Sequence, residues 1–149
     1  MANLHDLYQE ILLEHNNKPR NFRKLEDANR KADGYNPLCG DQITVYLRVE
    51  DDVIADVAFQ GVGCAISRAS ASMLTQSVKG QTVAKAEEIF DGFHSLITQP
   101  DAEVDYDLLG DLEMLSGVSA FPTRIKCAVL AWHTLNAAIE GSEDSVTTE

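Results

Sequence analysis

Residues 42–59 read QITVYLRVEDDVIADVAF, and apolar and polar residues alternate along most of this stretch. Alternation of this kind is the period of a β-strand with one buried face. The acidic residues 50–52 interrupt it and predict a turn, so the two halves form an antiparallel hairpin. The residues expected on the buried face are Ile43, Val45, Leu47, Val49, Val53, Ala55, Val57 and Phe59. A third short strand is predicted around residues 61–64.

Helical periodicity surrounds the predicted hairpin. Three of the expected helices cover residues 4–15, 65–78 and 122–139, and Gly141 follows the end of the last one. A fourth is expected to begin after the N-cap residue Thr82. Residues 21–38 and the acidic residues 99–117 show neither period and are predicted to be irregular. A small antiparallel sheet of about three strands packed against several helices is an α+β fold.

Length and composition fit one globular domain. The chain has 149 residues, of which 44% are hydrophobic, and we expect a domain over 1–141 with a polar flexible tail over 142–149. The net charge of −12 argues against nucleic-acid binding, because it repels phosphate. The sequence has no apolar run of the ~20 residues that span a membrane, and we see no signal peptide. The predicted location is therefore cytoplasmic.

Three cysteines give the chain its candidate chemistry, since an odd number in a cytoplasmic protein argues against a disulfide framework. Cys39 is predicted to lie in a loop, with Asp41 two residues later. Cys64 follows the glycine-containing segment 61–63 and opens a predicted helix, whose N-terminus favours a thiolate. Taken singly, each position also fits an ordinary turn or a small buried residue.

Cys127 is predicted to lie on the last helix, about 140° from the centre of that helix's apolar stripe. A cysteine kept for packing would lie on the stripe, so we expect Cys127 to face away from the core. Arg124 precedes it by one helical turn and would favour the thiolate, although a solvated helix flank is the commoner reason for an arginine there.

Three thiolates and a carboxylate make a tetrahedral ligand set suited to zinc: Cys39, Asp41, Cys64 and Cys127. Sulfur ligands also suit iron–sulfur clusters or Cu(I). The four histidines, none of which adjoins a cysteine, are expected to be structural or surface residues: His5, His15, His94 and His133.

Three motifs in this order resemble the SufU family, relatives of the IscU/NifU-type iron–sulfur scaffold proteins. They are NPLCGD at 36–41, GVGCAISRASASM at 61–73 and RIKC at 124–127, and the resemblance extends over nearly the whole chain. It implies a SufE/NifU-like fold and a zinc site formed by the four residues above. It also implies iron–sulfur cluster biogenesis as the process, with downstream cluster-assembly proteins as partners.

The resemblance implies that Cys39 accepts persulfide sulfur from a cysteine desulfurase of the SufS type. Pyridoxal phosphate belongs to that partner, one of whose histidines would displace Cys39 from zinc, and Arg124 would gate this ligand exchange. Lys126 stands where IscU has a histidine, and AFPTR at 120–124 replaces the chaperone-binding LPPVK segment. These departures favour a zinc-dependent sulfurtransferase. The alternatives are a scaffold for a labile iron–sulfur cluster and a purely structural zinc domain.

Overall fold

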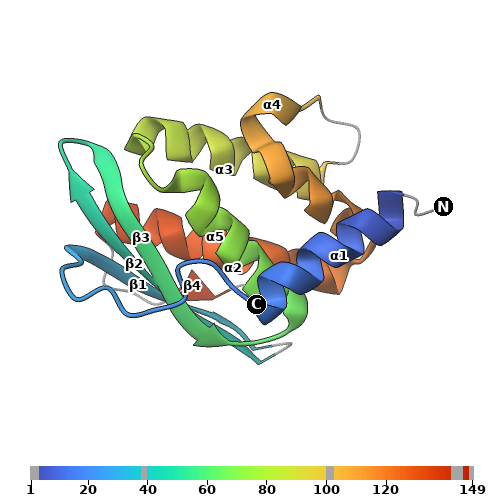
Figure 1. Ribbon diagram of the computed structural model, residues 1–149, viewed down its shortest axis with the longest axis horizontal. Helices are drawn as coiled ribbons and strands as arrows, with labels where there is room; N and C mark the ends of the chain where they lie inside the picture. Colours follow the sequence, from blue (N-terminus) through green and yellow to red (C-terminus); the bar gives the residue numbers. More distant parts are fainter. Residues whose placement is uncertain (1–3, 38–39, 100–102, 142–145, 148–149) are drawn as a thin grey trace.

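The computed structural model describes residues 4–37, 40–99, 103–141 and 146–147 (Figure 1). In chain order the elements are α1 (Leu4–Asn17), β1 (Arg30–Asn36), β2 (Asp41–Glu50), β3 (Val53–Val62), α2 (Ala65–Val78), α3 (Val83–Thr98), α4 (Tyr106–Leu109), the 3-10 helix η1 (Gly110–Ala120), α5 (Pro122–Glu140) and β4 (Val146–Thr147). The predicted α+β class is confirmed. In the described part of the chain, no helix is long and apolar enough to cross a membrane.

The sheet has the strand order β3-β2-β1-β4. Its three long strands are antiparallel, and two of them, β2 and β3, form the predicted hairpin, which turns at Asp51 and Asp52. Both turn residues have positive φ, which aspartate tolerates better than most residues, and successive positive φ values match the twist of a tight hairpin. The two-residue β4 pairs with β1 in parallel. It lies in the segment predicted to be a tail; the division at residue 141 stays a prediction.

Strand β1 was not predicted, because its buried face carries no large apolar residue. That face is formed by Ala32, Gly34 and Asn36. A side chain at Gly34 would collide with the Thr134 hydroxyl and crowd Leu130, both on α5. The strand therefore uses small residues to bring the helix close, and this hides the alternation on which strand prediction depends. The strand predicted at 61–64 is instead the end of β3, which runs to Val62.

A register shift in the hairpin changes which residues of β3 are buried. Val49 pairs with Ile54, whereas Arg48 pairs with Asp56, so Ala55 is an extra residue on its strand. Such a bulge moves the alternation by one position. Ile54 is fully buried, and Val53 and Ala55 are only half-buried. The prediction that Val53 and Ala55 belong to the buried face was therefore wrong, whereas Val57 and Phe59 are buried as expected.

The long helices follow their predicted signals. Helix α2 has the predicted bounds, and the Thr82 hydroxyl caps α3 by accepting a hydrogen bond from the Lys85 amide at 3.1 Å. Helix α5 ends at Glu140, and Gly141 after it adopts the left-handed conformation expected of a helix C-cap. Helix α1 runs two residues past its predicted end.

The acidic segment predicted as a loop is largely helical in its described part, which forms α4 and η1. Its buried residues recur at every third position: Leu109, Leu112, Leu115 and Val118. A spacing of three places side chains on one face of a 3-10 helix but spreads them around an α-helix, so a search for the α-helical period missed this element. This apolar face packs in the main core.

The core lies between one face of the sheet and the helices, with α2, α3 and α5 gathered on that side (Figure 1). Its largest fully buried residues include Trp132 of α5, Phe93 of α3 and Phe59 of β3. Each such side chain contributes about 1.5–3 kcal/mol to stability. This packing fixes the start of α5 and the start of α2 near the same end of the sheet.

Candidate metal centre

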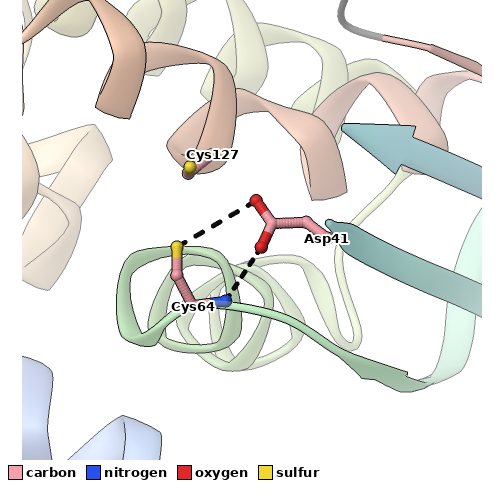
Figure 2. A group of neighbouring side chains, drawn as sticks. All are labelled: Asp41, Cys64 and Cys127. Atoms are coloured by element: carbon pink, nitrogen blue, oxygen red, sulfur yellow. Dashed lines mark hydrogen bonds between the residues drawn. The ribbon is translucent and has the colours of Figure 1, made fainter. Parts of the chain in front are cut away.

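Three of the four predicted ligands meet in space (Figure 2). Asp41 is the first residue of β2, Cys64 immediately precedes α2, and Cys127 lies in the second turn of α5. One ligand atom from each lies within 4.8 Å of the others, and the three side chains point toward one another. Cys39, the fourth predicted ligand, lies outside the described residues. In the part of the chain that is described, these three form the one group of at least three potential ligands.

Asp41 is 2% exposed, and both oxygens of its carboxylate accept hydrogen bonds. Oδ1 accepts a hydrogen bond from the Cys64 amide at 2.8 Å, and Oδ2 accepts one from the Asn36 side chain at 3.1 Å. Cys64 is the N-cap residue of α2, yet its own side chain makes no capping bond. Asp41 therefore satisfies an amide at this helix terminus and places negative charge where the helix dipole favours it.

The position of Asp41 depends on the absence of a side chain at residue 63. A Cβ atom at Gly63 would lie 2.5 Å from Asp41 Oδ1 and 3.1 Å from its carboxyl carbon. These separations are below normal van der Waals contact, and the buried carboxylate has little space into which to move. The glycine before Cys64 therefore makes room for the neighbouring ligand.

Cys127 is fully buried, so the prediction that it faces away from the core was wrong about its burial. The prediction assumed that α5 has one buried side, whereas α5 contacts the sheet, α2, α3 and η1. The Cys127 sulfur lies 3.4 Å from Asn36 Nδ2 and 3.8 Å from the Thr123 carbonyl oxygen. Cys127 thus faces a polar site inside the fold, while Cys64 is half-buried.

Asn36 is a site residue that sequence reasoning missed. It is fully buried, and its amide nitrogen donates to both Asp41 and Cys127. Its amide oxygen has no hydrogen-bond partner among the described residues. A buried polar atom without a partner costs about 1–3 kcal/mol, so the oxygen end of this amide lowers stability while the nitrogen end makes both hydrogen bonds. Its place in the NPLCGD motif was visible in the sequence, but its buried orientation required β1.

Arg124 lies in the first turn of α5, is exposed, and precedes Cys127 by one turn, as the sequence predicted. Lys126 is half-buried.

None of the histidines whose side chains are described belongs to the ligand group. His15 is buried against Ser72, 2.7 Å from its hydroxyl, and burial followed by the Arg20 charge lowers its pKa. Burial and nearby His94 likewise lower the pKa of His133.

The donor set fits zinc. It combines two sulfurs with one carboxylate oxygen, a combination that suits zinc better than magnesium or calcium. Bond lengths of about 2.3 Å to sulfur and 2.0 Å to oxygen place tetrahedral ligands about 3.5 Å apart. The present separations of up to 4.8 Å need to shorten by about 1 Å, which side-chain rotation can supply. A fourth ligand would complete the set.

A family model and two similar proteins place the chain in the same family. The family model described as the NifU-like N terminal domain matches residues 7–144. The zinc-dependent sulfurtransferase SufU of Bacillus subtilis is 40% identical over 142 residues, with 95% of each chain covered. The iron–sulfur cluster assembly scaffold protein IscU of Streptococcus pyogenes is 36% identical over 145 residues, covering 97% of this chain and 90% of that protein.

A solved structure agrees with the fold. It is the crystal structure of FiSufU from Fervidobacterium islandicum AW-1, a protein described as a candidate iron–sulfur cluster assembly scaffold for the SUF system. The two share 32% sequence identity and superpose with a TM-score of 0.83, covering 91% of this chain and 98% of that one. The relatives thus include proteins named for sulfur transfer and proteins named as scaffolds.

Proposed function

The chain belongs to the NifU-like N-terminal domain family, and on that premise we propose that it is a zinc-dependent sulfurtransferase of iron–sulfur cluster assembly. In this proposal Cys39, Asp41, Cys64 and Cys127 hold the zinc ion, and Cys39 receives the sulfur. The observation that carries it is the convergence of Asp41, Cys64 and Cys127 to within 4.8 Å from three separate elements. Bound zinc would keep its cysteine ligands in the thiolate form at neutral pH.

The proposed step is a thiol–persulfide exchange. The Cys39 thiolate attacks the terminal sulfur of a persulfide carried by a cysteine desulfurase. A new sulfur–sulfur bond forms at Cys39 as the old one breaks, and the desulfurase cysteine leaves as a thiolate. The product is a Cys39 persulfide, and the exchange needs no external oxidant or reductant.

The roles of the ligands follow from where they are anchored. Asp41, Cys64 and Cys127 are held by β2, α2 and α5, and two of them are hydrogen-bonded to Asn36. In the sequence Cys39 falls between the last residue of β1 and the first of β2, and we propose that it is the ligand that exchanges. Arg124, one turn from Cys127, would favour the thiolate forms and gate this exchange.

The proposed partners are a pyridoxal-phosphate-dependent cysteine desulfurase of the SufS type and the proteins that receive sulfur downstream. We place the reaction in the cytoplasm, because a centre built from thiols needs a compartment that keeps them reduced. One domain over residues 1–141 would carry the whole reaction.

The scaffold role is a second candidate, and the similarity to IscU of Streptococcus pyogenes favours it. In that role the same cysteines would hold a labile iron–sulfur cluster and pass it to apo-proteins. The two candidates differ in what they need: sulfur transfer needs zinc and a persulfide at Cys39, whereas a scaffold needs iron and sulfide.

The test is desulfurase turnover, measured as alanine released from cysteine, with zinc-loaded or metal-stripped protein added. We expect the zinc-loaded protein to raise turnover strongly, and Cys39→Ala to abolish this effect while the fold is retained. Mass spectrometry of the wild-type protein should find one additional sulfur on Cys39. A Cys39→Ala protein that still stimulates turnover would contradict the proposal.

Arg124→Ala is expected to lower the stimulated rate by about tenfold, because its charge acts near the exchanging ligands. Arg30→Ala is the matched control, since Arg30 is an exposed arginine at the opposite end of β1 from Asn36. If zinc-loaded protein gives no stimulation, and anaerobic iron and sulfide instead yield a stable brown cluster that can be transferred, the scaffold role is the correct one.

A further inference from the structure

Asn36 joins two of the ligands through a single amide group. Its Nδ2 atom lies 3.1 Å from Asp41 Oδ2 and 3.4 Å from Cys127 Sγ. An amide nitrogen carries two hydrogens and can donate one to each ligand atom. The reversed amide would place its oxygen against a carboxylate oxygen, so two acceptors would face each other. The arrangement therefore suits two acceptor atoms, one on each ligand.

The backbone brings this amide to Cys127 by close packing. Gly34 and Asn36 lie on the same face of β1, two residues apart. The absence of a side chain at Gly34 lets α5 approach β1 at Leu130 and Thr134. One turn earlier along α5 from Leu130 is Cys127, which meets Asn36. A longer side chain at Gly34 would therefore also part Asn36 from Cys127.

The unpaired oxygen of Asn36 indicates which end of the amide matters. In the described part of the chain, the nitrogen has two partners and the oxygen has none. An asparagine retained for stability alone would be expected to pair both ends, because an unpaired buried acceptor is costly. Here only the donor end is used, and both of its acceptors are candidate metal ligands.

We infer that Asn36 is a positioning residue of the metal centre: it fixes Asp41 and Cys127 relative to each other and offsets part of their negative charge. Asp41 and Cys127 are then the ligands that stay in place, and exchange occurs elsewhere in the set. This inference rests on the proposed function only in that the centre binds zinc. Supporting residues of this kind typically change metal affinity by about 10- to 100-fold.

The test compares zinc affinity, by competition with a chromophoric chelator, for the wild-type protein, Asn36→Ala and Asn36→Leu. Leucine keeps the branched shape and the number of side-chain heavy atoms of asparagine and removes the donor. We expect both variants to bind zinc about 10- to 100-fold more weakly. With cobalt(II) as the probe, the sulfur-to-metal charge-transfer band should move to longer wavelength, because Cys127 loses a hydrogen bond and becomes a stronger donor.

Asn29→Ala is the matched control, because Asn29 is exposed and its side-chain amide bonds to the Val49 backbone, away from the candidate ligands. It should leave affinity and the cobalt spectrum unchanged. Variants with wild-type affinity and spectrum would overturn the inference, as would variants that unfold even with saturating zinc, because the role would then be purely structural. A wild-type protein that binds no zinc would overturn the proposed function instead.

Discussion

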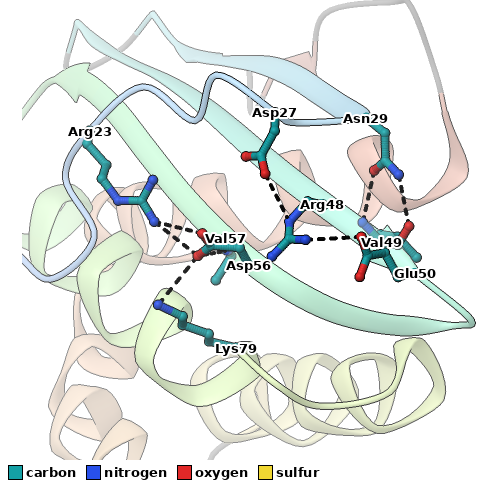
Figure 3. Close-up of polar contacts among 9 residues, drawn as sticks. All are labelled: Arg23, Asp27, Asn29, Arg48, Val49, Glu50, Asp56, Val57 and Lys79. Carbon is teal, nitrogen blue, oxygen red and sulfur yellow. Dashed lines mark hydrogen bonds and ion pairs between the residues drawn. The ribbon is translucent and has the colours of Figure 1, made fainter.

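Opposite ends of the sheet handle polar groups in opposite ways. The ligand end consists of Asn36, Asp41, Cys64 and Cys127, and the hairpin end consists of Arg23, Asp27, Asn29, Arg48, Glu50, Asp56 and Lys79 (Figure 3). At the hairpin end, Asp56 pairs with Arg23 at 2.9 Å and Lys79 at 3.4 Å, and Arg48 pairs with Glu50 at 3.0 Å. At the ligand end, the carboxylate of Asp41 is buried, and its hydrogen-bond partners among the described residues are Asn36 and Cys64, neither of which is a cation.

The hairpin end is therefore a charged surface that supports solubility, whereas the ligand end has the features of a binding site for a cation. Exposed ion pairs contribute about 0–1 kcal/mol each, so the hairpin end tolerates change. Buried carboxylate and sulfur groups gain much more from a cation, because burial removes the water that would otherwise stabilise their charge. Substitutions at the ligand end should therefore change metal binding, and those at the hairpin end should change only stability, by small amounts.

The largest effect is expected for Cys127→Ser. Serine keeps the shape and hydrogen-bonding capacity of cysteine at this buried position but is a poor zinc ligand. Zinc affinity should fall by more than about 100-fold, beyond the loss expected for a supporting residue. Chelator competition measures the affinity. Stoichiometric zinc retained by Cys127→Ser after desalting against a chelator would show that Cys127 is not a ligand.

Cys127→Ser can also be tested through the effect of zinc on the free energy of unfolding. Free zinc at a thousand times its Kd should stabilise the wild-type protein by about 4 kcal/mol, and chelation should remove that stabilisation. At the same concentration, zinc should stabilise Cys127→Ser by at least about 2.7 kcal/mol less than it stabilises the wild-type protein, because the affinity is more than about 100-fold lower. The metal-free proteins should unfold at similar temperatures.

An intermediate effect is expected for Gly63→Ala, because its new Cβ would lie 2.5 Å from Asp41 Oδ1. Displacing the carboxylate should weaken zinc binding by about tenfold and cost about 1–3 kcal/mol of stability. Gly117→Ala is the matched control, since a Cβ there meets nothing within 4 Å. Equal zinc affinities for the two variants, measured by chelator competition, would show that Asp41 does not depend on the space at Gly63.

The smallest effect is expected at the hairpin end, for Asp56→Asn. Burial raises the pKa of Asp56, but hydrogen bonds from Arg23 and the Val57 amide, with the charges of Arg23 and Lys79, outweigh it and lower the pKa below 3.8. This carboxylate therefore contributes stability above pH 3.8 that is lost as the pH falls through the lower folded-state pKa. Asp56→Asn should cost less than about 1 kcal/mol at pH 7.

Denaturant unfolding at pH 7 and near pH 3 checks this prediction. The difference between the wild-type protein and Asp56→Asn should shrink at the lower pH, and zinc affinity at pH 7 should be the same for both. A change in zinc affinity at pH 7 would mean that the two ends of the sheet are coupled and that the comparison between them fails.

Sequence patterns predicted those elements whose local signals agree with their packing. Helix α2 and the Thr82 cap follow from period and capping chemistry, and β2 follows from strict alternation. The predictions failed where tertiary structure overrides the local pattern. The buried face of β1 carries small residues such as Ala32 and Gly34, so the strand shows no clear apolar alternation. The buried residues of η1 recur at every third position, which is not the α-helical period.

The candidate site was predicted as a set of residue types and not as a geometry. Asp41, Cys64 and Cys127 were predicted because three thiolates and a carboxylate together form a zinc ligand set and lie in motifs that resemble the SufU family. The supporting residues do not stand out: Asn36 acts through a strand that was not predicted, and Gly63 acts through the space that it leaves. The position of Cys39 relative to the ligands lies outside the described residues and stays a prediction.

The distance in sequence between the parts of the centre has a consequence for biosynthesis. Asn36 and Cys127 are 91 residues apart, so a ribosome that has released β1, β2, β3 and α2 has not yet delivered the last sulfur. Because tight metal binding requires the assembled fold, a nascent chain or a proteolytic fragment without α5 would not hold the ion. Metal content would then distinguish finished molecules from incomplete ones, and unfinished chains would not deplete the cell's zinc.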